Sequence, residues 1–243
     1  MTYCVALNLR DGLVMLADTR TNAGADNVHT FRKLHVVEVP GDRVLAIMTA
    51  GNLAVSQAVL NLIEEGLDTE RGRETLRTVP NMWRAAELIG EAVRRVYRTD
   101  GPAMQAQNIA FDVSFLLGGQ IIGGPMRLFE VYAAGNFIEA GPEMPFFQLG
   151  EHKYGKPILD RALSWETPLE DGVKLVLISM DSTLRSNLTV GLPIDLLVVR
   201  NGALRVEREH RITEDDPYFR MIRERWSSAL REAYQGIPRP EWQ

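Results

Sequence analysis

The sequence predicts a layered α+β domain in which two antiparallel β-sheets carry helices on their outer faces. Short apolar runs separated by turn signals fill the first fifty residues, and apolar residues at helical spacing follow them. Along the whole chain the expected order is strands, two helices, strands, two helices, strands and one helix. A sheet and a helix are each apolar on one side, so stacking them in layers buries this pattern.

Length and composition indicate one globular domain spanning residues 1–243. Of the 243 residues, 45% are hydrophobic and 24% are charged, and no repeat, low-complexity segment or linker divides the chain. The net charge of −5 gives no basic surface for nucleic acid or an anionic membrane. With one cysteine, no signal-peptide pattern and no run of about 18 apolar residues, the chain is expected in the reducing cytoplasm.

The opening strands are expected at 3–9, 13–17, 34–39 and 44–48. Asp11-Gly12 supplies the first turn and Pro40-Gly41-Asp42 the last, so these strands form antiparallel hairpins. The apolar spacing then becomes helical between Asn52, a suitable N-cap, and Gly66, a suitable helix end. A second helix begins after residue 80 and carries apolar residues as far as residue 96.

The second half repeats this succession. Strands are expected at 109–116, 128–133 and 146–149, helices at 156–163 and 168–187, and strands at 194–199 and 204–207. Gly118-Gly119, Gly123-Gly124-Pro125 and Asn201-Gly202 are expected turns. The last helix has Asp216 as N-cap and Pro217 in its first turn. Its apolar face is expected to be buried and consists of Phe219, Ile222, Trp226, Leu230 and Ala233.

Thr2 is the first candidate for chemistry. Removal of Met1 would leave a free α-amine beside the threonine hydroxyl. A hydroxyl is a weak nucleophile at neutral pH, and an α-amine with a reference pKa of about 7.7–8.0 can accept its proton as an intramolecular base. A Met-Thr start alone is a weak signal, so the surrounding residues decide its meaning.

Two further residues strengthen that signal. Asp18 ends the second expected strand in the sequence Leu-Ala-Asp-Thr-Arg, and Lys33 immediately precedes the third. With Thr2, Asp18 and Lys33 the chain resembles the proteasome β-subunit family. The stretches 16–24, 153–161 and 179–191 resemble most closely the bacterial proteasome-related Anbu family, with the HslV peptidase a more distant relative.

The resemblance covers nearly the whole chain and implies a fold and an activity. The implied fold is the four-layer αββα sandwich of N-terminal nucleophile hydrolases of the proteasome β-subunit type. The implied activity is threonine-type endopeptidase cleavage of a peptide or unfolded polypeptide through an acyl-enzyme on Thr2. Self-assembly into rings or an open spiral of like subunits is also implied, and an ATPase partner is possible by analogy with HslV.

The resemblance assigns roles to the neighbouring residues. Lys33 would stabilise the developing alkoxide and make nearby amines less basic, and Asp18 would hold Lys33 by a charge-assisted hydrogen bond. The alternative for this pair is an ordinary surface ion pair, worth about 0–1 kcal/mol. Gly51, where a strand meets a helix, would offer its N–H to the oxyanion.

The remaining family positions match less well. A Ser or Thr in a Gly-rich loop contacts the threonine amine in the family, but here the loop is Gly150-Glu151-His152 and contains no Ser. Glu151 or His152 could substitute. Around the later helix, Ser186 is the preferred match for a supporting residue and Asp181 the second choice.

Two other functions remain open. A chain that keeps Met1, or whose site is incomplete, would be a non-catalytic or weakly active assembly subunit with the same fold. A third possibility is an amidohydrolase for a small, specialised peptide. The four histidines have no metal-ligand spacing and no nucleotide-binding motif occurs, so neither a metal nor a cofactor is expected. Cys4 is expected to be buried in its strand.

Overall fold

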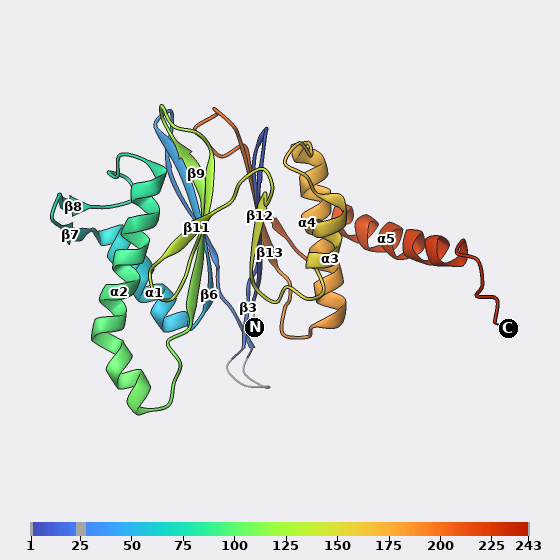
Figure 1. Cartoon of the computed structure of the whole chain (residues 1–243), viewed down its shortest axis with the longest axis horizontal. Coiled ribbons are helices and arrows are strands. Elements are labelled where there is room, and N and C mark those ends of the chain that lie inside the picture. The colour runs from blue at the N-terminus through green and yellow to red at the C-terminus, as the bar shows by residue number, and fades with distance from the viewer. Residues whose placement is uncertain (1, 23–27, 243) are drawn as a thin grey trace.

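The chain folds into four layers. The computed structural model describes residues 2–22 and 28–242. Helices α1 (Leu53–Glu65) and α2 (Met82–Ala106) cover one sheet, and a second sheet stacks on the first (Figure 1). Helices α3 (Lys156–Ala162) and α4 (Leu169–Ser186) cover the far side. The predicted α+β class and αββα layering are therefore confirmed.

The first sheet places the N-terminal strand beside a strand from the second half of the chain. Its strand order is β12-β1-β2-β13-β14, and every neighbouring pair is antiparallel. These strands are β1 (Tyr3–Leu9), β2 (Gly12–Asp18), β12 (Phe146–Gly150), β13 (Ile194–Arg200) and β14 (Arg208–Ile212). Because β1 lies next to β12, the main chain at Thr2 and Tyr3 runs beside Gly150.

The second sheet has the order β11-β10-β9-β6-β5 and is also antiparallel. Its strands are β5 (Leu34–Val39), β6 (Arg43–Gly51), β9 (Val113–Ile121), β10 (Arg127–Val131) and β11 (Phe137–Glu139). Two small hairpins were not expected from the sequence. They are β3 (Arg20–Asn22) with β4 (Val28–Thr30), and β7 (Leu67–Thr69) with β8 (Gly72–Glu74).

Side-chain caps precede α1, α2 and α5 (Pro217–Gln235), whereas α3 and α4 begin without one. Asn52 caps α1 by accepting the N–H groups of Ala54 and Val55, and Asp216 caps α5 by accepting that of Phe219 at 2.8 Å. Helix α2 is ten residues longer than the apolar pattern that ends at residue 96.

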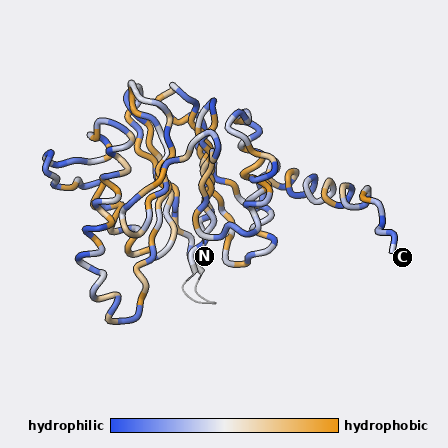
Figure 2. Tube along the Cα trace, viewed as in Figure 1, coloured by the Kyte–Doolittle hydropathy of each residue, from blue (hydrophilic) through white to orange (hydrophobic). Residues whose placement is uncertain are grey.

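Three apolar cores hold the layers together. One lies between α1, α2 and the second sheet, one between the two sheets, and one between the first sheet and α3, α4 and the start of α5. In Figure 2 the hydrophobic segments accordingly concentrate along the strands and on the inner sides of the helices. Burial of the strand faces thus fixes the two sheets against each other.

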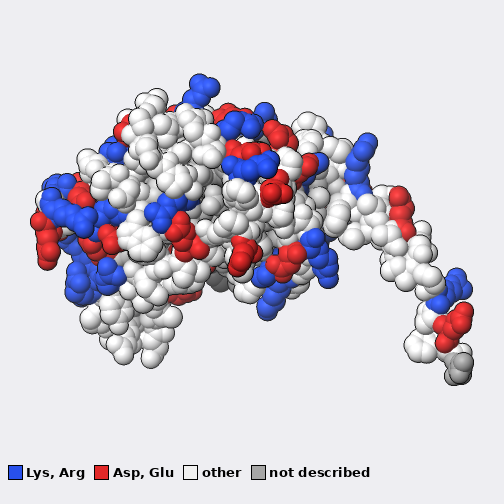
Figure 3. Space-filling view, turned by 45° about the horizontal axis from the view of Figure 1, so that its top comes forward, with Lys and Arg blue, Asp and Glu red and all other residues white. Residues whose placement is uncertain are grey.

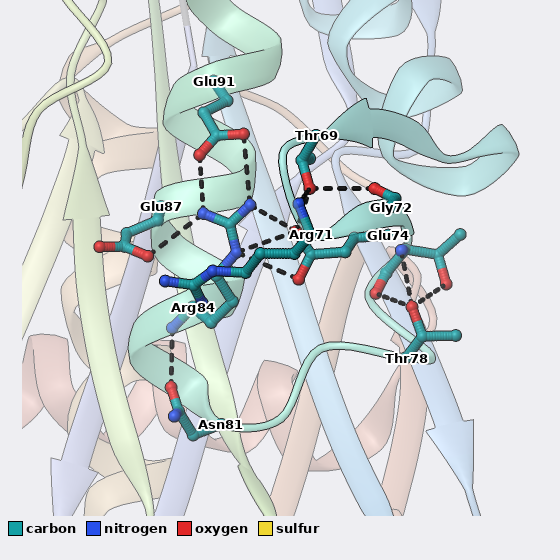
Figure 4. Close-up of polar contacts among 10 residues, drawn as sticks. Thr69, Arg71, Gly72, Glu74, Thr78, Asn81, Arg84, Glu87 and Glu91 are labelled. Atoms are coloured by element: carbon teal, nitrogen blue, oxygen red, sulfur yellow. Dashed lines mark hydrogen bonds and ion pairs between the residues drawn. The ribbon is translucent and has the colours of Figure 1, made fainter.

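The β7–β8 hairpin is joined to α2 by an ion pair (Figure 4). The guanidinium of Arg84 donates to Glu74 of β8 and to Glu87 and Glu91 of α2 itself. Arg84 is 5% exposed and Glu74 is 8% exposed, so the pairing compensates two charges that are largely removed from water.

One predicted strand begins later than its pattern indicates. Residues 109–112 are not in a strand, and β9 starts at Val113 and runs on through Gly118 and Gly119, which were expected to form a turn. A Cβ at Gly119 would lie 2.2 Å from the carbonyl oxygen of Val44, and one at Gly118 would lie 2.7 Å from Leu13 of the other sheet. The two glycines therefore permit close packing within and between the sheets, whereas glycine pairs more often indicate turns.

The strand expected at 204–207 is also displaced. The turn at Asn201-Gly202 is confirmed, but the strand that pairs with β13 runs from Arg208 to Ile212. Leu204 has φ of +47°, which is incompatible with a regular strand. The apolar Leu204 and Val206 suggested a strand, whereas the residues of β14 itself are mostly polar and exposed.

The final helix is only half buried, contrary to the sequence prediction. Phe219 and Ile222 are buried, but Leu230 is 51% exposed and Ala233 is also exposed, because α5 leaves the body of the molecule (Figure 1). Apolar turns remain visible along this projecting part (Figure 2). Trp226 is partly buried, whereas Leu230 and Tyr234, farther along the helix, have little protein to pack against within the chain.

Charge is mixed over the surface. On the face shown in Figure 3, basic and acidic side chains are interspersed, including along the projecting helix. Within the part of the chain that the structure describes, none of the helices has the length and apolarity needed to cross a membrane.

Candidate active site

A cavity of about 320 Å³ lies where the N-terminal end of β1 meets the C-terminal end of β6. Thr2, which is partly exposed, lines it together with Lys33 and Gly51. The other lining residues are Thr21, Thr49, Ala50, Leu53, Ser56, Asp112 and Gly150. Residues from both sheets and the start of α1 therefore meet at one concave site.

Lys33 is paired with Asp18 behind the cavity. Lys33 Nζ donates to Asp18 Oδ1 at 2.6 Å and to the carbonyl oxygen of Arg20 at 2.7 Å. Lys33 is 5% exposed and Asp18 is fully buried, so this is not an ordinary surface ion pair. The ammonium group is held by two oxygen atoms from the β2–β3 segment.

The carboxylate of Asp18 is held in turn by the main chain. It accepts the N–H groups of Tyr3 at 3.0 Å, Arg20 at 3.2 Å and Gly191 at 3.4 Å. Burial raises the pKa of the Asp18 carboxyl, and the Lys33 ammonium and the N–H groups of Tyr3 and Gly191 oppose that rise. Because Tyr3 follows Thr2 directly, Asp18 links the start of β1 to the lysine.

The main chain of Thr2 is fixed from its other side. The N–H of Glu151 donates to the carbonyl oxygen of Thr2 at 2.7 Å. Gly150 has φ of +76°, and a Cβ there would lie 2.1 Å from the same carbonyl oxygen. A glycine is therefore required at this position to let the two chains approach.

Gly51 adopts a conformation that only glycine accepts readily. Its φ is +99°, and a Cβ would lie 2.3 Å from the carbonyl oxygen of Asp112. It ends β6, and Asn52 then caps α1, so Gly51 lies beside a helix N-terminus that faces the cavity.

Comparison with solved structures shows what kind of protein has this arrangement. An Anbu mutant from Hyphomicrobium sp. strain MC1 is 50% identical over 100% of both chains, with a TM-score of 0.92. Anbu from Yersinia bercovieri, an ancestral beta-subunit, is 47% identical over 99% of this chain and 100% of its own, with a TM-score of 0.91. The chain belongs to the Anbu family.

A third Anbu structure adds an assembly. The Anbu complex from Pseudomonas aeruginosa, solved as a helical assembly, is 49% identical over 98% of both chains, with a TM-score of 0.92. No family model and no curated protein matches the chain. The resemblance to the Anbu family drawn from the three sequence stretches is confirmed, and with it the proteasome-like fold.

Two of the site residues expected from the Anbu resemblance lie apart from the cavity. Ser186 is exposed at the end of α4, and Asp181, fully buried, lies one turn earlier. Asp181 pairs with Arg185 at 3.1 Å and with Arg223 of α5 at 2.9 Å. Neither is among the described residues that line the cavity, and the contacts of Asp181 join α4 to α5.

The loop that lacks the family serine uses its residues differently. Both carboxylate oxygens of Glu151 accept hydrogen bonds, from the Lys153 N–H at 2.8 Å and from Asn187 Nδ2 at 2.9 Å. His152 is exposed and contacts the carbonyl oxygen of Gly150. Cys4 is buried, as predicted, and burial raises the pKa of its thiol well above its usual range.

Several residues of this Anbu site were not found from the sequence. Thr49 lies two residues before Gly51 in β6, so strand alternation could have placed both on one face. Thr21 lies within the recognised stretch 16–24 but was given no role there, and Asp112 lies in a misassigned strand. No local pattern distinguishes either residue. Met1 lies outside the described residues, so the predicted processing of the N-terminus stays a prediction.

Proposed function

We propose that the chain is a proteasome-type threonine peptidase that cleaves peptide bonds after Met1 has been removed. The convergence of Thr2, the buried Lys33–Asp18 pair and Gly51 on one cavity carries this proposal. Membership of a proteasome-related family adds to it.

The residues divide the reaction between them. The hydroxyl oxygen of Thr2 attacks the amide carbonyl, and the free α-amine of Thr2 accepts the hydroxyl proton. The tetrahedral intermediate collapses with cleavage of the C–N bond, and the proton passes to the departing amine. Water then hydrolyses the ester that joins the acyl group to Thr2 and regenerates the hydroxyl.

The polar groups around Thr2 favour this reaction. The Lys33 ammonium, held by Asp18 and the Arg20 carbonyl, stabilises negative charge developing on the hydroxyl oxygen. The Gly51 N–H serves the oxyanion, and loss of one such donor typically costs about 10²–10³ in rate. Ser186 and Asp181 stay predictions as supporting residues, and the ion pairs of Asp181 favour a structural role.

We also propose that copies of the chain assemble with one another. The related Anbu complex from Pseudomonas aeruginosa forms a helical assembly. Leu230 and Tyr234, 51% and 64% exposed on the projecting part of α5, offer an apolar surface for a neighbouring subunit. An ATPase partner, by analogy with HslV, and a cytoplasmic location, from the single cysteine, belong to the proposal as expectations.

The peptidase proposal is tested by turnover. Purified protein is incubated with short fluorogenic peptides and with an unfolded polypeptide, and Thr2→Ala serves as control. Cleavage of both substrates that is absent from Thr2→Ala supports the proposal. Cleavage of short peptides alone would narrow the activity to a specialised peptide amidohydrolase, and no Thr2-dependent cleavage would leave a non-catalytic assembly subunit.

A further inference from the structure

Glu151 lies beside Thr2, but its carboxylate accepts hydrogen bonds from other residues. Its main-chain N–H donates to the Thr2 carbonyl at 2.7 Å, while its side chain turns to Lys153 and Asn187. Glu151 is 6% exposed. A carboxylate this deeply buried is costly unless hydrogen bonds compensate it, so its two partners are integral to the loop.

Asn187 connects this carboxylate to a second loop. It is the C-cap of α4, and its Oδ1 accepts the N–H of Thr189 at 3.0 Å and the hydroxyl of Thr189 at 2.5 Å. Its Nδ2 donates to Glu151 Oε2. The side-chain amide thus organises the loop of residues 187–191 with its oxygen and binds Glu151 with its nitrogen.

The 187–191 loop then reaches the catalytic candidates from the other side. The N–H of Gly191 donates to Asp18 Oδ2 at 3.4 Å, and the carbonyl oxygen of Leu188 accepts from Arg20 Nη1 at 2.7 Å. A Cβ at Gly191 would lie 2.3 Å from Cζ of Arg20, so the loop packs closely against the segment that follows β2. Asp18, which holds Lys33, is therefore held in part by this loop.

These contacts join the two sides of the site into one connected path. It runs from the Thr2 carbonyl to Glu151, from Glu151 to Asn187, and along the 187–191 loop to Asp18 and Lys33. Burial opposes ionisation of Glu151, but the Lys153 N–H and the Asn187 amide outweigh it and lower the pKa of the carboxyl. The carboxylate is the form that accepts from both partners.

We propose that Glu151 is a positioning residue whose hydrogen bond to Asn187 fixes the Thr2 main chain relative to the Asp18–Lys33 pair. This inference rests on the proposed threonine chemistry for its effect on rate, but the connection itself is a property of the folded chain.

Exchanging the donor at position 187 and the acceptor at position 151 tests the proposal. In Glu151→Gln the new side-chain amide N–H must face one of the two donors, Lys153 N–H or Asn187 Nδ2. In Asn187→Asp the new carboxylate faces the carboxylate of Glu151. Each single variant therefore loses a hydrogen bond. The double variant Glu151→Gln/Asn187→Asp restores the pattern with donor and acceptor exchanged. The amide introduced at position 151 donates to the carboxylate introduced at position 187 and still accepts from the Lys153 N–H. The exposed Glu166→Gln is a matched control for the loss of one carboxylate.

The first readout is the reaction of the nucleophile with a β-lactone. Because a displacement of 1 Å can cost about 10² in rate, we expect each single variant to lower the maximal inactivation rate by about 10- to 100-fold without weakening reagent binding. The double variant recovers most of this rate, and Glu166→Gln retains it. A single variant that reacts like the wild type, or a double variant as slow as the singles, overturns the proposal.

The second readout does not require catalysis. Hydrogen exchange of the Glu151 amide, which donates to Thr2, is expected to be slow in the wild type and the double variant and faster in both singles. If the wild type does not react with any lactone, the proposed function fails and exchange alone decides. Two results would then overturn the proposed link from the Glu151–Asn187 hydrogen bond to the Thr2 main chain. One is faster exchange in the single variants without recovery in the double variant, and the other is no change in exchange in any variant.

Discussion

The Lys33–Asp18 pair is the residue-scale feature on which the proposed chemistry depends. A buried ion pair contributes little net stability, because desolvation offsets the attraction, but it is strongly destabilising to break from one side. Lys33 is 5% exposed and Asp18 is not exposed at all. A chain that required only packing at this position could do without both charges, so their presence favours a chemical role.

We predict that Lys33→Met separates stability from reactivity when it is combined with Asp18→Asn. Lys33→Met alone leaves the buried Asp18 carboxylate unpaired and is expected to cost about 3–5 kcal/mol in the free energy of unfolding, measured in urea. Adding Asp18→Asn removes that charge and recovers much of the stability, yet the β-lactone still fails to label Thr2. A double variant that is labelled at the wild-type rate would argue against a catalytic Lys33.

We predict that Gly51→Ala lowers both the stability of the fold and the reactivity of Thr2. Both Gly51→Ala and Gly41→Ala introduce strain at a positive φ of +99° and +78°, worth about 1–3 kcal/mol each. A Cβ at Gly41 meets nothing within 4 Å, whereas one at Gly51 meets the Asp112 carbonyl at 2.3 Å. Thermal unfolding should therefore show the larger loss for Gly51→Ala, and only that variant should lose labelling of Thr2. Equal losses in stability would contradict this reading of the site.

At the scale of elements, regular patterns made most of the fold predictable. The hairpin of β1 and β2, the caps Asn52 and Asp216 and the helices they begin follow directly from local sequence. The predictions were wrong where contacts between residues distant in sequence determine the local structure. Gly118 and Gly119 are glycines because of atoms on other strands, and the polar β14 is a strand because it pairs with β13.

The candidate site could be predicted only in part, for the same reason. Thr2, Asp18 and Lys33 lie on or next to the first strands and follow from a recognisable spacing. Glu151 and Asn187 are 36 residues apart in sequence, and their hydrogen bond results from the packing of two loops. Asp181 has a suitable position in the helix, but its arginine partners on α4 and α5 show it joining the two helices.

The β7–β8 hairpin provides an element-scale prediction that depends on pH. The hydrogen bonds from Arg84 lower the pKa of Glu74 below its ordinary value of 4.5 (Figure 4). Stability from this pair is therefore fully present above 4.5 and is lost as the pH falls through the lower, folded-state pKa. We expect Arg84→Met to flatten this part of the acid-unfolding profile, and Arg98→Met, an exposed arginine on the same helix, to leave it unchanged. Parallel profiles for Arg84→Met and the wild type would contradict the role of the pair.

For the whole molecule, the projecting half of α5 predicts self-association. We expect Leu230→Glu/Tyr234→Glu to form smaller species than the wild type in analytical ultracentrifugation. Both residues are exposed in the single chain, so the stability of the subunit should change by no more than about 0.5 kcal/mol. The exposed Arg225→Ala on the same helix is the control. A double variant with the wild-type size distribution would place the assembly contacts elsewhere.

The proposed chemistry depends on one chemical group, the hydroxyl of Thr2 after Met1 has been removed. Intact mass spectrometry before and after treatment with an epoxyketone tests it most directly, with Thr2→Ala as control. We predict a wild-type mass that lacks Met1 and gains one covalent adduct, and no adduct on Thr2→Ala. A retained Met1 with no adduct would contradict the proposed nucleophile.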